Sequence, residues 1–171
     1  IGEISTDLGT LIHNPSNGYI YAMTIYNNDT DTHSIAVIDP YRNTVIKNIQ
    51  IGETDNFFGD LIYNPSNGYI YATSIMNKTG TLSVIDPSTN TVIKNIQIAK
   101  APNYHFRNDI IHNPSNGYIY VMNIDAPIND TNTGYVGYVT VIDPARSNVL
   151  KNIQIGEIST DLGTLIHNPS N

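Results

Sequence analysis

Apolar residues occur along the chain in short runs rich in Ile, Val, Tyr and Thr, with Asn, Asp, Gly, Pro and Ser between the runs. Gly18 to Ile25, Ile35 to Ile38 and Val45 to Ile51 are three such runs. β-Branched and aromatic residues favour extended backbone, whereas the separating residues favour turns. No segment shows a sustained helical period of apolar positions. The pattern therefore predicts short β-strands joined by turns.

Three sequence markers recur in a constant order. NPSNGYIY, shortened to NPSN in its last copy, occupies 14–21, 64–71, 113–120 and 168–171. VIDP follows at 37–40, 84–87 and 141–144, and NTVIKNIQI or NVLKNIQI follows that at 43–51, 90–98 and 148–155. From VIDP to the next NIQ the offset is always 11 residues, whereas from NPSN to VIDP it is 23, 20 and 28. The chain is thus a tandem repeat with one rigid and one variable connection.

Each repeat contains four predicted strands, which in the first repeat read GTLIH, GYIYAM, SIAVID and TVIKNIQI. NPSNG joins the first two strands, with Pro15 fixing φ and Gly18 free to adopt positive φ. DPYRN, DPSTN and DPARS join the last two in the three repeats. The variable connection, TIYNNDTDTHS in the first repeat, is interpreted as a loop, and His33 and His105 are both assigned to loops.

An antiparallel four-stranded unit of about 50 residues has the size of a β-propeller blade. Such a sheet is apolar on both faces and must stack on copies of itself to bury them. We therefore predict an all-β fold of the β-propeller type. Its blades are expected at 9–52, 59–99 and 108–156, with the first strand of a next blade at 157–171.

The run NPSNGYIYATSIMNKTGTLSVIDPSTNTVIKNIQI at 64–98 resembles the YVTN-type β-propeller repeat. That family reads roughly NPDG, then VYVTN, then VSVIDTATNTVV, then a short apolar strand. The resemblance covers essentially the whole chain, although GYIYAM and its copies replace VYVTN and the loops are longer. It implies a propeller fold and a place among archaeal surface-layer-like and other exported proteins.

IGEISTDLGTLIHNPSN occupies both 1–17 and 155–171. The repeats differ freely outside their markers, so selection for the fold does not explain this identity. It indicates a super-repeat of three blades, with the chain as one period of a longer array plus an overlap. Two super-repeats would close a six-bladed ring, whereas many copies joined head to tail would form an open superhelix or filament. In the filament, the terminal strand of one unit would lie on the blade of the next. We favour the open polymer, and the ring remains the alternative.

Charge and composition exclude several classes of function. The net charge is −7 with only 13% charged residues, which makes nucleic acid an unexpected partner. No Cys is present, so disulfides and thiolate chemistry are excluded. No stretch approaches the roughly 20 apolar residues that span a bilayer, so membrane insertion is not expected. The sequence predicts no cofactor.

Several polar and aromatic residues recur with the repeat and have a structural interpretation. The Asp of each VIDP initiates a turn, and the Lys of each fourth strand protects a sheet edge: Asp39, Asp86, Asp143, Lys47, Lys94 and Lys151. Imidazoles in the first strand could bind a metal, but Tyr63 shares their position and favours packing: His13, His112 and His167. The paired tyrosines of the second strand are expected to pack between blades: Tyr19, Tyr21, Tyr69, Tyr71, Tyr118 and Tyr120.

The variable loops carry the remaining candidates. Each loop contains one N-x-T sequon, a possible glycosylation site in an exported protein: Asn28, Asn77 and Asn129. Loop oxygens could hold a calcium ion, although no loop has the spacing of a defined calcium motif. Tyr26, Tyr135 and Tyr138 could contact a surface glycan or a protein, with 134–138 interpreted as a Tyr-rich loop.

No catalytic constellation stands out among the residues, because the polar positions simply repeat with the blade. The favoured interpretation is a non-enzymatic extracellular or cell-surface structural protein that assembles with itself into a filament, sheath or adhesive coat. One alternative is a closed propeller that binds sugar or protein. Another is a fragment of a propeller enzyme, such as a lactonase-like protein or a dehydrogenase subunit.

Overall fold

A computed structural model of the chain describes residues 9–24, 32–53, 59–76, 79–100, 109–125, 135–158 and 165–168. Within these ranges the chain forms twelve β-strands and no helix. The described residues accordingly contain no helix that is long and apolar enough to cross a membrane. The all-β prediction is confirmed.

The strands form three four-stranded sheets. The first sheet contains β1 (Leu11–His13), β2 (Ile20–Thr24), β3 (Thr32–Asp39) and β4 (Thr44–Glu53). The second contains β5 (Leu61–Tyr63), β6 (Ile70–Met76), β7 (Thr79–Asp86) and β8 (Thr91–Lys100). The third contains β9 (Ile110–His112), β10 (Ile119–Asp125), β11 (Tyr135–Asp143) and β12 (Asn148–Ile158).

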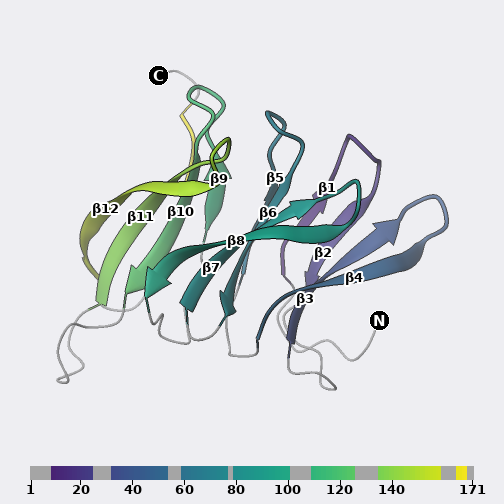
Figure 1. Ribbon diagram of the computed structural model, residues 1–171, viewed down its shortest axis with the longest axis horizontal. Helices are drawn as coiled ribbons and strands as arrows, with labels where there is room; N and C mark the ends of the chain where they lie inside the picture. The colour runs from purple at the N-terminus through teal and green to yellow at the C-terminus, as the bar shows by residue number, and fades with distance from the viewer. Residues whose placement is uncertain are drawn as a thin grey trace.

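Each sheet is an antiparallel meander in chain order, so consecutive strands are neighbours throughout. The three sheets stand side by side in chain order, with the second between the other two (Figure 1). The short first strands β1, β5 and β9 are neighbours of one another across the sheets, as are the long last strands β4, β8 and β12. This is the arrangement of successive propeller-type blades, and the described sheets do not close into a barrel.

The NPSNG turn has the geometry that its residues predict. In the first copy, the Asn14 carbonyl accepts from the Gly18 amide at 2.9 Å, and Asn14 Oδ1 accepts from the Ser16 amide at 2.9 Å. Gly18 has a φ of 75°, a conformation that glycine adopts without a steric penalty. The same bonds and similar positive φ angles recur at Gly68 and Gly117. The hairpin between the first two strands is therefore encoded locally in each repeat.

The Asp of VIDP caps the second hairpin, as the sequence predicts. Asp39 Oδ1 accepts from the Tyr41 amide at 2.9 Å, and Asp39 Oδ2 accepts from the Arg42 guanidinium at 2.6 Å. The Arg42 hydrogen bond lowers the pKa of the Asp39 carboxyl. Asp143 has the same partners in Ala145 and Arg146, while Asp86 is bound by the amide and hydroxyl of Ser88. These carboxylates are turn residues.

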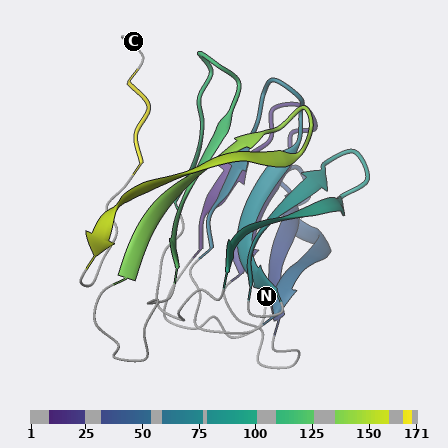
Figure 2. The same cartoon turned by 60° about the vertical axis from the view of Figure 1, so that its left-hand side comes forward.

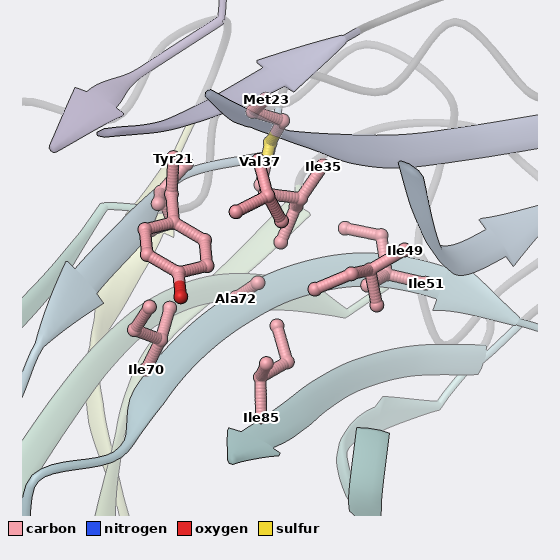
Figure 3. Packing of buried hydrophobic residues seen from close by; sticks show 10 residues of the cluster. Tyr21, Met23, Ile35, Val37, Ile49, Ile51, Ile70, Ala72 and Ile85 are labelled. Carbon is pink, nitrogen blue, oxygen red and sulfur yellow. The ribbon is translucent and has the colours of Figure 1, made fainter. Parts of the chain in front are cut away.

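The core lies between the sheets. One cluster joins the first and second sheets, and its residues from both sheets interdigitate (Figure 3). A second cluster joins the second and third sheets. Since each sheet is covered only where another stacks on it, the middle sheet is buried on both faces. This matches the prediction that no blade can bury its apolar faces alone.

The strands extend further into the variable connection than predicted. His33, assigned to a loop, lies in β3 opposite Gly52 and is buried. Tyr135 and Tyr138, assigned to a Tyr-rich loop, lie in β11, where Tyr138 is half-buried opposite Gln154. The reason is that the ladder with the long fourth strand continues past a register shift in each sheet, and pairing overrides the turn-forming composition. His105 lies outside the described residues.

Candidate assembly interface

Every sheet presents two different faces along the array. We call the face toward the following sheet the leading face; in the first sheet it consists of Tyr21, Met23, Ile35, Val37, Ile49 and Ile51. We call the face toward the preceding sheet the trailing face; in the second sheet it includes Leu61, Ile70, Ala72, Ile85 and Val92. The same repeat positions form the second interface, with Ile110, Ile119, Val121, Ile142 and Val149 on the trailing face of the third sheet. A leading face therefore always meets a trailing face.

Polar contacts fix the register across the first interface. The buried Tyr21 hydroxyl accepts from Asn17 Nδ2 at 2.9 Å within its own sheet. It donates to Asn90 Oδ1 of the second sheet at 2.6 Å. Asn17 Nδ2 also donates to the Pro87 carbonyl at 3.1 Å. Burial raises the pKa of Tyr21, so the neutral hydroxyl persists as the donor.

A row of serine contacts links the first strand of each sheet to the turn of the preceding sheet. Ser16 Oγ lies 2.6 Å from Tyr63 Oη of the next sheet, and Ser66 Oγ lies 3.3 Å from His112 Nε2. The NPSN serine of one repeat thus bonds the aromatic or imidazole side chain that ends the next first strand. This contact accounts for the shared position of His and Tyr that the sequence shows.

Two further kinds of contact cross between sheets. Lys47 Nζ donates to the Thr89 carbonyl at 3.1 Å, so this fourth-strand lysine binds the neighbouring turn as well as facing solvent. Ser74 Oγ donates to the Ile51 carbonyl at 2.8 Å, and Thr140 Oγ1 to the Ile98 carbonyl at 3.3 Å. Most of the polar residues that recur with the repeat therefore have structural partners.

The end sheets expose the positions that are buried inside the array. On the leading face, Ile49 and Ile51 are 4% and 1% exposed, whereas Ile153 and Ile155 at the same positions of the third sheet are 40% and 52% exposed. On the trailing face, Leu61 is 1% exposed, whereas Leu11 of the first sheet is 63% exposed. The third sheet thus has an open leading face and the first sheet an open trailing face. The two faces are complementary by repeat position.

Residues 165–168 lie against the third sheet in the place of a further first strand. His167 Nε2 is 3.4 Å from Ser115 Oγ, which continues the serine row by one step. The Leu165 amide donates to Asp109 Oδ2 at 3.1 Å. The segment runs along the outer side of the third sheet, away from the first two (yellow in Figure 2). Its sequence, LIHN, is that of residues 11–14, so it takes the position that β1 would have in a following first sheet.

The Tyr21 contact predicts opposite effects for one pair of substitutions. Asn90 and Ser147 occupy the same turn position with φ angles of 53° and 50°, but the Tyr71 hydroxyl has no bond to Ser147 among the described contacts. Asn90→Ser should lower the free energy of unfolding by about 1 to 2 kcal/mol, because a buried donor loses its acceptor. Ser147→Asn should raise it by about 1 kcal/mol, because Asn tolerates positive φ and adds an acceptor.

Thermal melts followed by circular dichroism measure both variants. Asn43→Ser is the matched control, because Asn43 has a φ of 52° but belongs to the first of the described sheets, where no described sheet precedes it, so it reports the backbone effect alone. Equal losses for Asn90→Ser and Asn43→Ser would contradict a contribution from the Tyr21 bond.

The candidates from the variable loops lie largely outside the described residues. This applies to the sequon residues Asn28, Asn77 and Asn129 and to Tyr26. Glycosylation at the three asparagines and a ligand contact at Tyr26 therefore remain predictions. Of the predicted contact tyrosines, Tyr135 and Tyr138 are placed, both in β11. No group of three His, Asp or Glu side chains in the described part of the chain is arranged as a metal site.

Comparison with known proteins supports the fold. No protein-family model matches the sequence, and no curated protein matches it. Among solved structures, a chain of the Kuenenia stuttgartiensis hydrazine synthase superposes with a TM-score of 0.62 at 18% identity, over 91% of this chain. This chain spans 40% of that one. A likeness at this identity concerns the fold alone, and it agrees with stacked propeller-type blades.

Proposed function

We propose that this protein is a non-enzymatic structural repeat protein that assembles with itself head to tail. The observation that carries the proposal is the pair of open faces: the leading face of the third sheet and the trailing face of the first repeat the surfaces that pack on each other twice within the chain. Because each contact joins two different faces, a pair of copies still has one open face of each kind. Further copies can therefore add until a ring closes or a fibre forms.

The setting of this assembly is the cell surface or the extracellular space. The resemblance to the YVTN-type repeat supports an exported, archaeal surface-layer-like protein. Sequons at Asn28, Asn77 and Asn129 would make it a glycoprotein, with glycans on the connections between second and third strands. The product of assembly would then be a filament, sheath or adhesive coat, with surface glycans as a further partner.

A structural role also explains the repeated polar residues. Asp39 and Asp143 bind turn amides and arginines, Lys47 binds a neighbouring turn, and the first-strand imidazoles bind serines. An enzyme concentrates special residues at one end of its blades. Here the same contacts recur from sheet to sheet, which supports assembly over a lactonase-like or dehydrogenase-like activity.

A closed ring is the second candidate, and one observation favours it. Two copies have one open leading face and one open trailing face each, so a six-bladed ring would cover all four. Such a ring would be a binding module and not a coat.

The two assemblies are separated by sedimentation and electron microscopy of the purified chain across a concentration series. We expect mass to grow with concentration and fibres to appear. Uniform rings of two copies would support the binding module instead. A strictly monomeric chain at high concentration would overturn the proposal.

A further inference from the structure

We infer that the joint between copies is made by strand exchange: residues 165–168 of one chain replace β1 in the first sheet of a second copy. The inference rests on the proposed function and specifies its interface. The donor segment is 165–168 and the acceptor strand is β2 of the second copy. The first sheet of that copy docks on the leading face of the third sheet.

The donor segment already occupies its place. Its His167 contact with Ser115 repeats the contacts of Tyr63 with Ser16 and of His112 with Ser66, so it sits in the register of a first strand. In the other sheets this strand pairs on its far side with a second strand. Residues 165–168 are not assigned to a strand. None of the three described sheets includes 165–168, so no described second strand lies beside the segment.

The second copy supplies that strand. In its first sheet, Leu11, Ile12 and His13 pair with Ala22, Tyr21 and Ile20. Leu165, Ile166 and His167 are the same residues in the same order, so they can pair with the same β2 in the same register. The sequence identity then continues through 168–171, which matches the NPSN turn leading to Gly18.

Docking forces a choice between two identical strands. When the trailing face of a second copy packs on the leading face of the third sheet, residues 165–168 and the incoming 11–14 require one place beside β9. A segment that only occupied the place would obstruct assembly. If the segment instead replaces the incoming β1 and pairs with the incoming β2, it no longer obstructs docking and becomes part of the contact between the copies, as in strand addition and domain swapping.

Strand exchange also explains why the two copies of this segment are identical. A donor must satisfy both the preceding sheet, as 165–168 does, and the following β2, as β1 does. Every side chain is then constrained by both environments. The rest of the joint repeats the internal interfaces: Tyr120, held by Asn116 at 2.8 Å, would donate to Asn43 of the second copy as Tyr21 does to Asn90.

A cysteine pair tests the exchange directly, because the chain contains no cysteine of its own. Leu11 and Ala22 lie between the bonded pairs Met23 with Thr10 and Asn14 with Tyr19, so they form a non-hydrogen-bonded pair. Side chains in such pairs lie close enough for a disulfide. Within one chain, Ala22 lies in the first sheet and Leu165 bonds Asp109 beside the third sheet, and the second sheet stands between these two sheets (Figure 1).

The double variant Leu165→Cys/Ala22→Cys is oxidised and run on a non-reducing gel. We expect covalent oligomers that collapse to monomer on reduction: a ladder for an open polymer, or dimers alone for a two-copy ring. Ile166→Cys/Ala22→Cys is the matched control, because adjacent side chains of a strand point to opposite faces, and it should give about tenfold less product.

A second variant locks the acceptor. Oxidised Leu11→Cys/Ala22→Cys ties β1 to its own β2, so it should lose self-association in sedimentation, and reduction of the same sample should restore it. If the wild-type chain associates but the locked variant associates equally well and the gel shows no covalent oligomers, strand exchange is overturned and head-to-tail packing stands. If the wild-type chain does not associate at all, the proposed function itself fails.

Discussion

The double substitution Ile153→Ser/Ile155→Ser is expected to abolish most self-association while leaving the single chain folded. In the internal interfaces these positions are almost fully buried, so docking should bury both side chains of the third sheet. Removing two such side chains should weaken association by about 3 kcal/mol, which is about 100-fold in the dissociation constant. Because both are already exposed in the single chain, its free energy of unfolding should change little.

A matched control separates the interface from general hydrophobicity. Ile46, Ile93 and Leu150 share one fourth-strand position and are 44%, 49% and 46% exposed, whether or not a sheet covers the leading face. Ile46→Ser/Leu150→Ser therefore removes the same number of exposed apolar side chains from positions that packing does not bury. Sedimentation equilibrium should show association close to wild type for this control. Equal weakening by both double variants would mean that association is non-specific.

The repeat markers predicted the sheets because the information they carry is local. In NPSNG, the Asn14 side chain bonds the Ser16 amide and Gly18 takes positive φ, so the hairpin is determined within a few residues. The same holds for the aspartates that cap the second hairpin. Elements of this kind can be predicted from one sequence without an alignment.

Strand length was predicted less well, because it depends on pairing. His33 and Tyr138 stand in segments with the composition of loops, yet both belong to strands since a long fourth strand offers partners beyond a register shift. A signal was present in the sequence: the alternating run of the fourth strand extends past NIQI to Gly52 and Gly156, and a partner of similar length was to be expected.

The hydrogen bonds between side chains of different sheets could not be predicted from the sequence. Tyr21 and Asn90 are 69 positions apart in the sequence, and no pattern in either repeat indicates that their side chains form a hydrogen bond. The tyrosines were expected to pack between blades, and Tyr21 and Tyr71 do so. Their hydrogen-bond partners, and the seating of 165–168 on the third sheet, required the relative placement of the sheets. These contacts define the candidate interface.

The largest effect on folding is expected at Leu61. Leu61→Ala removes a side chain that is 1% exposed between the first two sheets, so it should lower the free energy of unfolding by about 3 kcal/mol. Leu11→Ala is the matched control, because it makes the same change at the same repeat position, where the side chain is 63% exposed. Its effect on the single chain should be below about 0.5 kcal/mol.

Urea unfolding followed by circular dichroism, at a concentration where the chain is monomeric, measures both variants. The comparison tests whether a blade owes its stability to the neighbour that covers it, since side-chain type and strand position are held constant. If Leu11→Ala cost as much as Leu61→Ala, each sheet would be stable by itself.

At concentrations where copies associate, one leucine becomes buried at the joint. It is Leu11 of the acceptor copy if that copy keeps its own β1, and Leu165 of the donor copy if the strand is exchanged. If the acceptor keeps its own β1, Leu11→Ala should lower the stability of the assembly more than that of the single chain. If the strand is exchanged, Leu165→Ala should have this effect instead.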